Sequence, residues 1–152
     1  MILDKRWNGL TQISNGDYVL EGDLIVEDDL TIQLNDCLVV KGRVFAKKSI
    51  FVEKSLISNK GIEAGEGIKA GCGIKAGEGI KAGWGIKAGC GIKAGWGIEA
   101  GEGIEAKTYI HSEKRIFAGV SVYHTSETCE KTIKCAELSK GEICFGDLII
   151  VQ

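Results

Sequence analysis

The chain has 152 residues, of which 44% are apolar, and this is enough for the core of one ordinary domain. Its 19 basic and 21 acidic residues give a formal net charge of −2, so the charge balance favours neither a nucleic acid nor an anionic membrane as a partner. No apolar run approaches the length of about 18 residues that crosses a bilayer. No signal peptide is visible in MILDKRWNGL, so we expect a cytoplasmic protein whose six cysteines are reduced.

Residues 1–18 precede the regular part of the sequence and are predicted to form an N-terminal cap. A coiled fold with open strand edges needs such a cover. Trp7, Leu10 and Ile13 are the apolar residues expected to lie over the first turn.

Aliphatic residues recur every six positions from Leu20 to Val122. A second series, mostly small or aliphatic, follows each of them two places later, and Asp28 is its one plain violation. A spacing of two puts both residues on the same side of an extended strand. The residue between them is Glu or Lys from position 63 to 105 and is expected to point outward, and the Gly-x-Gly that follows turns a corner.

Residues 19–126 are therefore predicted to form an all-β, single-stranded, three-sided parallel β-helix. A strand of three residues buries its apolar side only if it pairs with the strand one full turn later. Three hexads make a turn of 18 residues, and about six turns stack to a length of about 29 Å. An α-helix would place successive isoleucines about 240° apart, and collagen would need glycine at every third position.

These motifs resemble two groups of proteins. The run Leu38-Val39-Val40-Lys41-Gly42 resembles bactofilins, which are polymer-forming β-helix proteins, and this resemblance favours a right-handed coil. The GIKAGWGIEAG array and RIFAGVSVYHTSETCEKTIKCAELSKGEICFGDLIIVQ, within residues 61–152, are similar to glycine-rich hexapeptide-repeat proteins of gut bacteria, phages and mobile elements. The hexapeptide acyltransferases match poorly, because here the small residue follows the aliphatic one by two places and not by four.

The residues that vary between the hexapeptides are expected on the outer surface of the coil. Residues 18 apart stack, which gives three outward columns: Glu63, Lys81 and Glu99; Lys69, Lys87 and Glu105; and Lys75, Lys93 and His111. The charges form either a solvated surface or a lysine-rich stripe that meets an acidic partner. Five lysines are thus candidate binding residues: Lys69, Lys75, Lys81, Lys87 and Lys93.

Trp84 and Trp96 stand at glycine-flanked corners and are the other candidate binding residues. They either cover glycine backbone or anchor a contact, since exposed tryptophan is a frequent hot-spot residue. Cys72 and Cys90 are predicted to lie one layer apart without a disulfide, because stacked parallel strands orient the two thiols poorly.

No pattern in the chain indicates catalysis, a metal or a cofactor. The sequence contains no Cys-x-x-Cys, and its two histidines, His111 and His124, lack metal-ligand spacing. No glycine-rich loop ends in Gly-Lys-Ser/Thr. We therefore expect a protein that is not an enzyme.

Residues 127–152 are predicted to form a C-terminal β-hairpin. Residues 132–135 and 143–151 have the alternation of strands, with a turn at 139–142 between them. The hairpin would either close the coil or pair with a second copy in a homo-oligomer.

Three functions compete on these observations. The first is a non-catalytic binding module that presents the tryptophans and lysines to a host protein; the resemblance to phage and mobile-element proteins implies an inhibitor of a host defence enzyme, such as a CRISPR-Cas effector. The alternative is a self-assembling, bactofilin-like structural scaffold, which requires uncapped ends. An enzyme or sugar-binding β-helix is the third, and the sequence offers it no acid pair or cleft.

Overall fold

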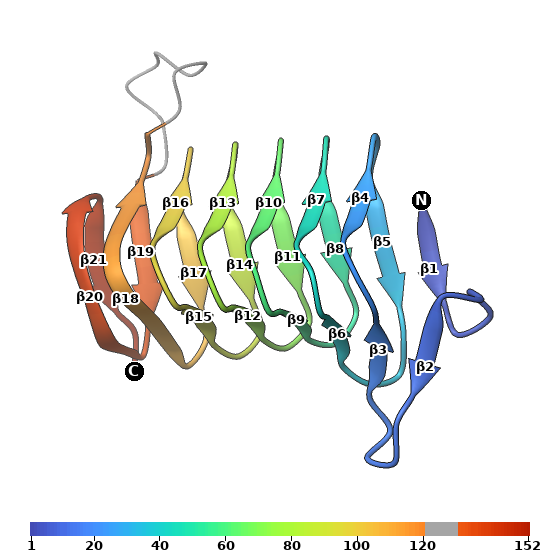
Figure 1. Ribbon diagram of the computed structural model, residues 1–152. Helices are drawn as coiled ribbons and strands as arrows, with labels where there is room; N and C mark the ends of the chain where they lie inside the picture. The colour runs from blue at the N-terminus through green and yellow to red at the C-terminus, as the bar shows by residue number, and fades with distance from the viewer. Residues whose placement is uncertain (121–130) are drawn as a thin grey trace.

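The structure is a computed structural model that describes residues 1–120 and 131–152 (Figure 1). The described residues form short, mainly parallel strands stacked in about seven turns of a β-solenoid. This confirms the predicted parallel β-helix, with slightly more turns than the expected six. The described part of the chain contains no helix that could span a membrane.

The coil has three sides, and each side is a stack of short strands. The first side holds β4 (Leu24–Val26), β7 (Val44–Ala46), β10 (Ile62–Ala64), β13 (Ile80–Ala82), β16 (Ile98–Ala100) and the second half of β18 (Tyr109–Ala118). The second side holds β1 (Ile2–Asp4), β5 (Leu30–Gln33), β8 (Ile50–Val52), β11 (Ile68–Ala70), β14 (Ile86–Ala88), β17 (Ile104–Ala106), β19 (Thr132–Cys135) and β21 (Asp147–Ile150). The third side holds β2 (Leu10–Gln12), β3 (Tyr18–Leu20), β6 (Leu38–Val40), β9 (Leu56–Ser58), β12 (Ile74–Ala76), β15 (Ile92–Ala94) and the first half of β18, and β20 (Glu137–Phe145) follows β18 from the third side to the first.

The repeat keeps its register from β6 to β18. Ile62 pairs with Ile80, and Ile80 with Ile98, so residues 18 apart lie in adjacent turns as predicted. In the first full turn the pairs are 20 apart, because two extra residues stand between β5 and β6; Tyr18 pairs with Leu38 and Leu24 with Val44. The extra residues shift the inward positions by two, so Asp28 falls at a corner and does not interrupt the core.

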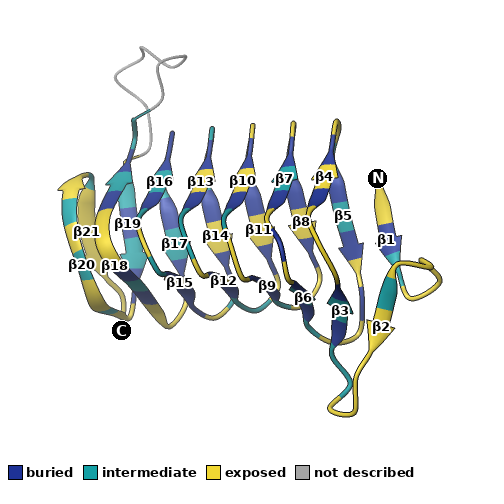
Figure 2. Cartoon of the chain, viewed as in Figure 1, coloured by how far each residue is buried: buried dark blue, intermediate teal, exposed yellow. Residues whose placement is uncertain are grey.

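The interior is a column of aliphatic side chains that runs from Leu3 to Ile133. In the glycine-rich turns each strand supplies one isoleucine and one alanine to this column, while the residue between them points outward. Ile62, Ile80 and Ile98 stack on one another and are each 1% exposed. Figure 2 shows buried inward positions from the first turns to β19, whereas β20 and β21 are largely exposed. Burial of one such side chain stabilises the fold by about 1.5–3 kcal/mol.

The N-terminal residues cover the first turn, but largely with other side chains than those expected. β1 pairs with β5, and β2 pairs antiparallel with β3. Leu3 is fully buried and Leu10 packs against the core. Trp7 and Ile13 are 37% and 43% exposed, so the prediction that they cover this turn is wrong. Both residues stand outside the strands, and Trp7 lies over Gly9 instead.

The C-terminal segment continues the coil and does not form the predicted antiparallel hairpin. β19 pairs in parallel with β17 and β21, and β20 pairs in parallel with β18. Leu148 and Ile150 stack on the buried Ile133 and Cys135, so the apolar alternation of this segment extends the inward column. Alternation alone does not distinguish the two kinds of pairing, because both place every second residue on one side.

The inward residues are covered to different extents at the two ends of the coil. In the first turn Leu24 and Val26 are 3% and 6% exposed. In the last turn Leu148 and Ile150 are 41% and 52% exposed, and no described strand pairs with the outer edge of β21. The inward residues are therefore buried at the N-terminal end of the described coil and exposed at its C-terminal end, although the outer edges of β1 and β4 are unpaired as well.

Candidate functional site

The two glycines of each Gly-x-Gly corner meet different surroundings, as Gly77 and Gly79 illustrate. A Cβ atom on Gly77 would lie 2.1 Å from the carbonyl oxygen of Asn59 in the preceding turn, so no side chain fits there. A Cβ atom on Gly79 would lie 3.5 Å from the carbonyl oxygen of Gly97, an ordinary van der Waals distance, and its φ is not positive. Backbone packing therefore requires Gly77 and tolerates a side chain at Gly79, whereas at Gly97 a Cβ atom would lie only 3.0 Å from Arg115 O.

Side chains do occupy the Gly79 column in other turns of the first side. Arg43, Gly61, Gly79, Gly97 and Arg115 hold equivalent positions in five successive turns. The arginine at each end shows that a long side chain is compatible with this backbone position. The three glycines between them leave a strip of bare backbone, and the whole column spans about 19 Å at a rise of about 4.8 Å per turn.

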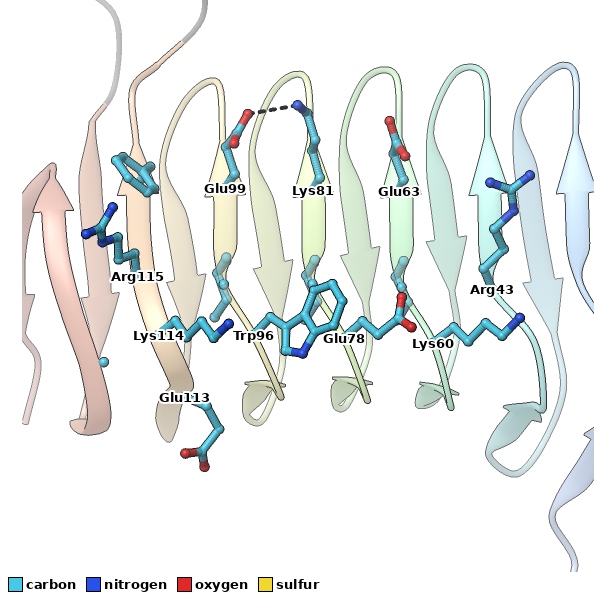
Figure 3. A pocket seen from close by; sticks show the side chains of 18 of the residues that line it. Arg43, Lys60, Glu63, Glu78, Lys81, Trp96, Glu99, Glu113, Lys114 and Arg115 are labelled. Atoms are coloured by element: carbon cyan, nitrogen blue, oxygen red, sulfur yellow. Dashed lines mark ion pairs between the residues drawn. The ribbon is translucent and has the colours of Figure 1, made fainter.

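This bare strip is the floor of a groove of about 1050 Å³ (Figure 3). Two rows of side chains border it. The corner rim consists of Lys60, Glu78, Trp96 and Lys114, which precede the strands, and the strand rim consists of Glu63, Lys81 and Glu99, which point outward from them. Figure 3 shows the two rows on either side of the floor, with Arg43 and Arg115 toward its ends. Each corner-rim residue faces the strand-rim residue three positions later in the chain, and three residues of extended chain span about 10 Å.

Both rims of the groove carry charges of both signs, and the charges alternate in every turn of the strand rim. On the strand rim, Lys81 Nζ lies 3.0 Å from Glu99 Oε1. Both side chains are about half exposed, so this ion pair contributes a few tenths of a kcal/mol at most. No hydrogen bond or ion pair within the described residues involves the side-chain charges of Lys60, Glu63 or Glu78. Three rim charges of both signs are thus available to a ligand.

Aromatic residues stand at intervals along the same groove. Trp96 is 55% exposed on the corner rim, and Lys114 Nζ lies 5.5 Å from the centre of its ring. This cation–π contact orients the indole along the rim. Phe45 and Phe117 are half-buried next to Arg43 and Arg115, so each end of the groove carries an Arg-x-Phe unit.

The predicted binding residues do not gather at one place. Trp84 and Trp96 border the first side from its opposite edges, because Trp84 follows β13 and Trp96 precedes β16; only Trp96 lines the groove. The backbone of each tryptophan pairs with that of a glutamate in the preceding turn. Trp84 N donates a hydrogen bond of 3.0 Å to Glu66 O, and Trp96 N donates one of 3.1 Å to Glu78 O.

The five predicted lysines lie on all three sides. Lys81 is on the first side and lines the groove. Lys69 and Lys87 are on the second side, where Lys87 Nζ lies 3.0 Å from Glu105 Oε2, and Lys75 and Lys93 are on the third. The structure therefore contains no single stripe that unites the five lysines.

The other two sides offer less open space over their glycines. On the second side the corresponding cavity measures about 310 Å³ and is bordered by Phe51, Lys69 and Lys87. On the third side Tyr109 lies over Gly91, so that a Cβ atom there would meet its ring at 2.4 Å. The first side thus has the larger of the two described grooves, and its glycine floor is not covered by an aromatic ring.

A small charge cluster closes the groove toward the C-terminal turn. Glu113 Oε1 lies 2.8 Å from His111 Nε2, Lys140 Nζ pairs with Glu113 Oε2, and Ser139 Oγ lies 3.0 Å from His111 Nδ1. The hydrogen bonds from Lys140 and from His111 lower the pKa of Glu113 from 4.5 to about 2. Glu113 therefore remains an anion at neutral pH and links β18 to β20.

The described residues contain no group of three or more His, Cys, Asp or Glu side chains arranged for a metal ion. Cys72 and Cys90 lie in adjacent turns, with Cys90 N donating to Cys72 O at 2.9 Å, and both thiols are free. The two residues therefore stack in adjacent turns, as the sequence predicted. Val122 and His124, which the sequence predictions named, lie outside the described residues.

The groove itself was not identified from the sequence. Its floor is made of glycines that the repeat explains equally well as corner residues, so Gly61, Gly79 and Gly97 carry no separate signal. Arg43 and Arg115 do carry one, since they stand at the two ends of the glycine column, four turns apart. Comparison with known proteins finds no matching family model, no similar curated protein and no similar solved structure.

Proposed function

We propose that the protein is a non-catalytic binding module that holds a segment of another protein in the first-side groove. The observation that carries this proposal is the bare floor at Gly61, Gly79 and Gly97. At Gly61 and Gly79 the fold tolerates a side chain, and neighbouring turns have arginine in the same column. A surface kept free of side chains allows a partner to approach the backbone closely.

The composition of the rims favours a protein as the ligand. Lys60, Glu63 and Glu78 place charges of both signs beside the floor, whereas a nucleic acid is held by positive charge. Trp96 adds an exposed aromatic anchor, the residue type most enriched at binding hot spots. A rigid coil also loses little conformational entropy when it binds.

The proposal is tested with Gly79→Arg, which fills the floor with a side chain that the column already accepts at positions 43 and 115. Wild-type protein is used to capture partners from a bacterial lysate, and a captured protein is identified, purified and titrated. We expect Gly79→Arg to weaken its binding at least tenfold while the circular dichroism spectrum stays unchanged.

Gly67→Arg is the matched control. Gly67 holds the same corner position on the second side, where a Cβ atom would also lie 3.5 Å from a carbonyl oxygen, and the charge change is identical. This variant should bind as wild type does. Equal affinity of the wild type and Gly79→Arg for the captured protein would refute the proposal.

The narrower role, inhibition of a host defence enzyme, rests on the resemblance to phage and mobile-element proteins. Co-expression with a CRISPR-Cas system in a plasmid-interference assay tests it directly. Restored plasmid survival that is lost in Gly79→Arg would support inhibition through the groove.

The alternative function, self-assembly, is favoured by a different observation: the open C-terminal end. Leu148 and Ile150 expose the inward column there, and the outer edge of β21 is unpaired among the described strands. A contact between two C-terminal ends uses the same surface of both copies and would stop at a dimer; a filament would also need a contact at the N-terminal end, where the inward residues are buried.

A further inference from the structure

The dimensions of the first-side groove indicate what kind of segment it holds, and this inference rests on the proposed function. The carbonyl oxygens of the floor are already engaged: Gly61 O, Gly79 O and Gly97 O accept hydrogen bonds of 2.9–3.0 Å from Val44, Ile62 and Ile80. A partner strand would therefore find no free carbonyl edge along the floor, and strand addition at this surface is disfavoured.

Spacing separates a helix from an extended peptide. Rim side chains recur once per turn of the coil, at about 4.8 Å along its axis. An α-helix lying along the groove presents one residue per turn to each rim at about 5.4 Å, which differs from the rim spacing by about 0.6 Å at every turn. An extended strand presents same-face residues about 6.6 Å apart, which misses the rim spacing by about 1.8 Å at every turn.

The width of the first-side groove and its bare floor also favour an α-helix as the ligand. Facing rim residues are at most about 10 Å apart, because three residues of extended chain join them, so a helix of about 10–12 Å diameter with its side chains contacts both rims. Since the floor has no side chains, a helix with small residues on its inner face can lie close to the backbone.

We propose that the ligand is an amphipathic α-helix of at most about 13 residues, the length that fits the 19 Å between the positions of Arg43 and Arg115, with small residues facing the floor at Gly61, Gly79 and Gly97. Charge complementarity fixes its flanks. On the flank that faces the corner rim, the helix carries an acidic residue against Lys60, a basic one against Glu78, an apolar one against Trp96 and an acidic one against Lys114. On the flank that faces the strand rim, it carries a basic residue against Glu63, an acidic one against Lys81 and a basic one against Glu99.

The probes are two synthetic helical peptides of equal composition, one with this pattern and one with every charge reversed. Both have alanine on the inner face, and binding is titrated by calorimetry at low ionic strength. We expect the matched peptide to bind the wild type at least tenfold more tightly than the reversed peptide, and to lose that preference in Gly79→Arg but not in Gly67→Arg. Equal binding of the two peptides, or no binding of either, would overturn the helix assignment.

A second measurement separates this inference from the proposed function. The captured partner is cross-linked to the wild-type protein, and the segment that reaches Lys60 and Lys81 is located by mass spectrometry. A helical segment supports the inference. An extended segment whose binding is still lost in Gly79→Arg would overturn the helix assignment and leave the binding function in place.

Discussion

Gly77 and Gly79 flank Glu78 at the same corner, yet only Gly77 is required by the packing of the coil. The reason is geometric: the Cβ position of Gly77 points at the carbonyl oxygen of Asn59 from 2.1 Å, and that of Gly79 points into the groove, 3.5 Å from the nearest backbone oxygen. Two glycines that look equivalent in the sequence therefore differ in role: Gly77 allows adjacent turns to pack, and Gly79 leaves the floor of the groove free of a side chain.

Gly77→Ala is expected to destabilise the protein by about 3 kcal/mol or more, because the new methyl group forces two turns apart. Gly79→Ala is expected to change stability by less than about 1 kcal/mol, and the sign can be favourable since alanine restricts the unfolded chain. For a chain of this size 3 kcal/mol corresponds to a fall in Tm of about 6–12 °C. Thermal unfolding followed by circular dichroism measures both variants, and equal Tm values for the two would contradict the distinction.

The fold could be predicted from the sequence because the repeat satisfies one physical requirement in every turn. Ile80 and Ala82 must face inward and Lys81 outward, and only a three-sided coil allows this at a six-residue spacing. The two extra residues between β5 and β6 were missed because Leu20, Val26 and Ile32 still fall six apart. In the structure each of them is the second inward residue of its strand and not the first. The parallel pairing of β19 and β21 was missed because alternation is common to both pairings.

The candidate site was much harder to predict from the sequence. Trp96 was identified because an exposed aromatic stands out in a repeat of small residues, and Lys81 because it is charged. Trp84 stands out equally, but it lies on the far edge of the first side. The groove depends on which glycines the backbone needs, and that depends on interatomic distances between turns that a linear sequence does not contain.

Acidification should loosen the contact between β18 and β20. The pKa of Glu113 is lowered to about 2 by Lys140 and His111, below its ordinary value of 4.5. A carboxyl group with a lowered pKa stabilises the folded state fully above its unfolded pKa, and the contribution is lost as the pH falls from about 4.5 toward 2. The protection of β20 amides against hydrogen exchange, measured relative to the intrinsic exchange rate at each pH, should therefore fall over this range in the wild type, whereas Glu113→Gln should show lower protection already at pH 7 and a weaker pH dependence. An identical profile for the two proteins would contradict the role of Glu113.

Trp96→Ala should weaken binding of the captured partner by about 2 kcal/mol or more, the effect typical of a hot-spot residue. Trp84→Ala should change it by less than about 0.5 kcal/mol, since Trp84 does not line the groove. Titration of the purified partner against each variant provides the measurement, and the two substitutions remove the same side chain from comparable corners. A larger loss in Trp84→Ala would shift the binding surface to the opposite edge of the first side.

The open C-terminal end leads to an expectation about self-association. Ile150 is 52% exposed and belongs to the inward column, so burial against a second copy would remove apolar surface from water. In an antiparallel contact of two β21 strands about a twofold axis at Ile149, Leu148 of one copy faces Ile150 of the other, and Asp147 keeps its ion pair with Lys131 at 3.4 Å.

Sedimentation at micromolar concentrations should show a dimer for the wild type and a monomer for Ile150→Lys, because the twofold axis would bring two lysines into an apolar contact. Ile25→Lys is the control, since Ile25 is similarly exposed, at 49%, but stands on the outer surface of β4 near the N-terminal end. This variant should dimerise as the wild type does. Filaments in place of dimers would mean that the N-terminal end also accepts a partner, and a wild type that stays monomeric would remove the case for self-assembly through this end.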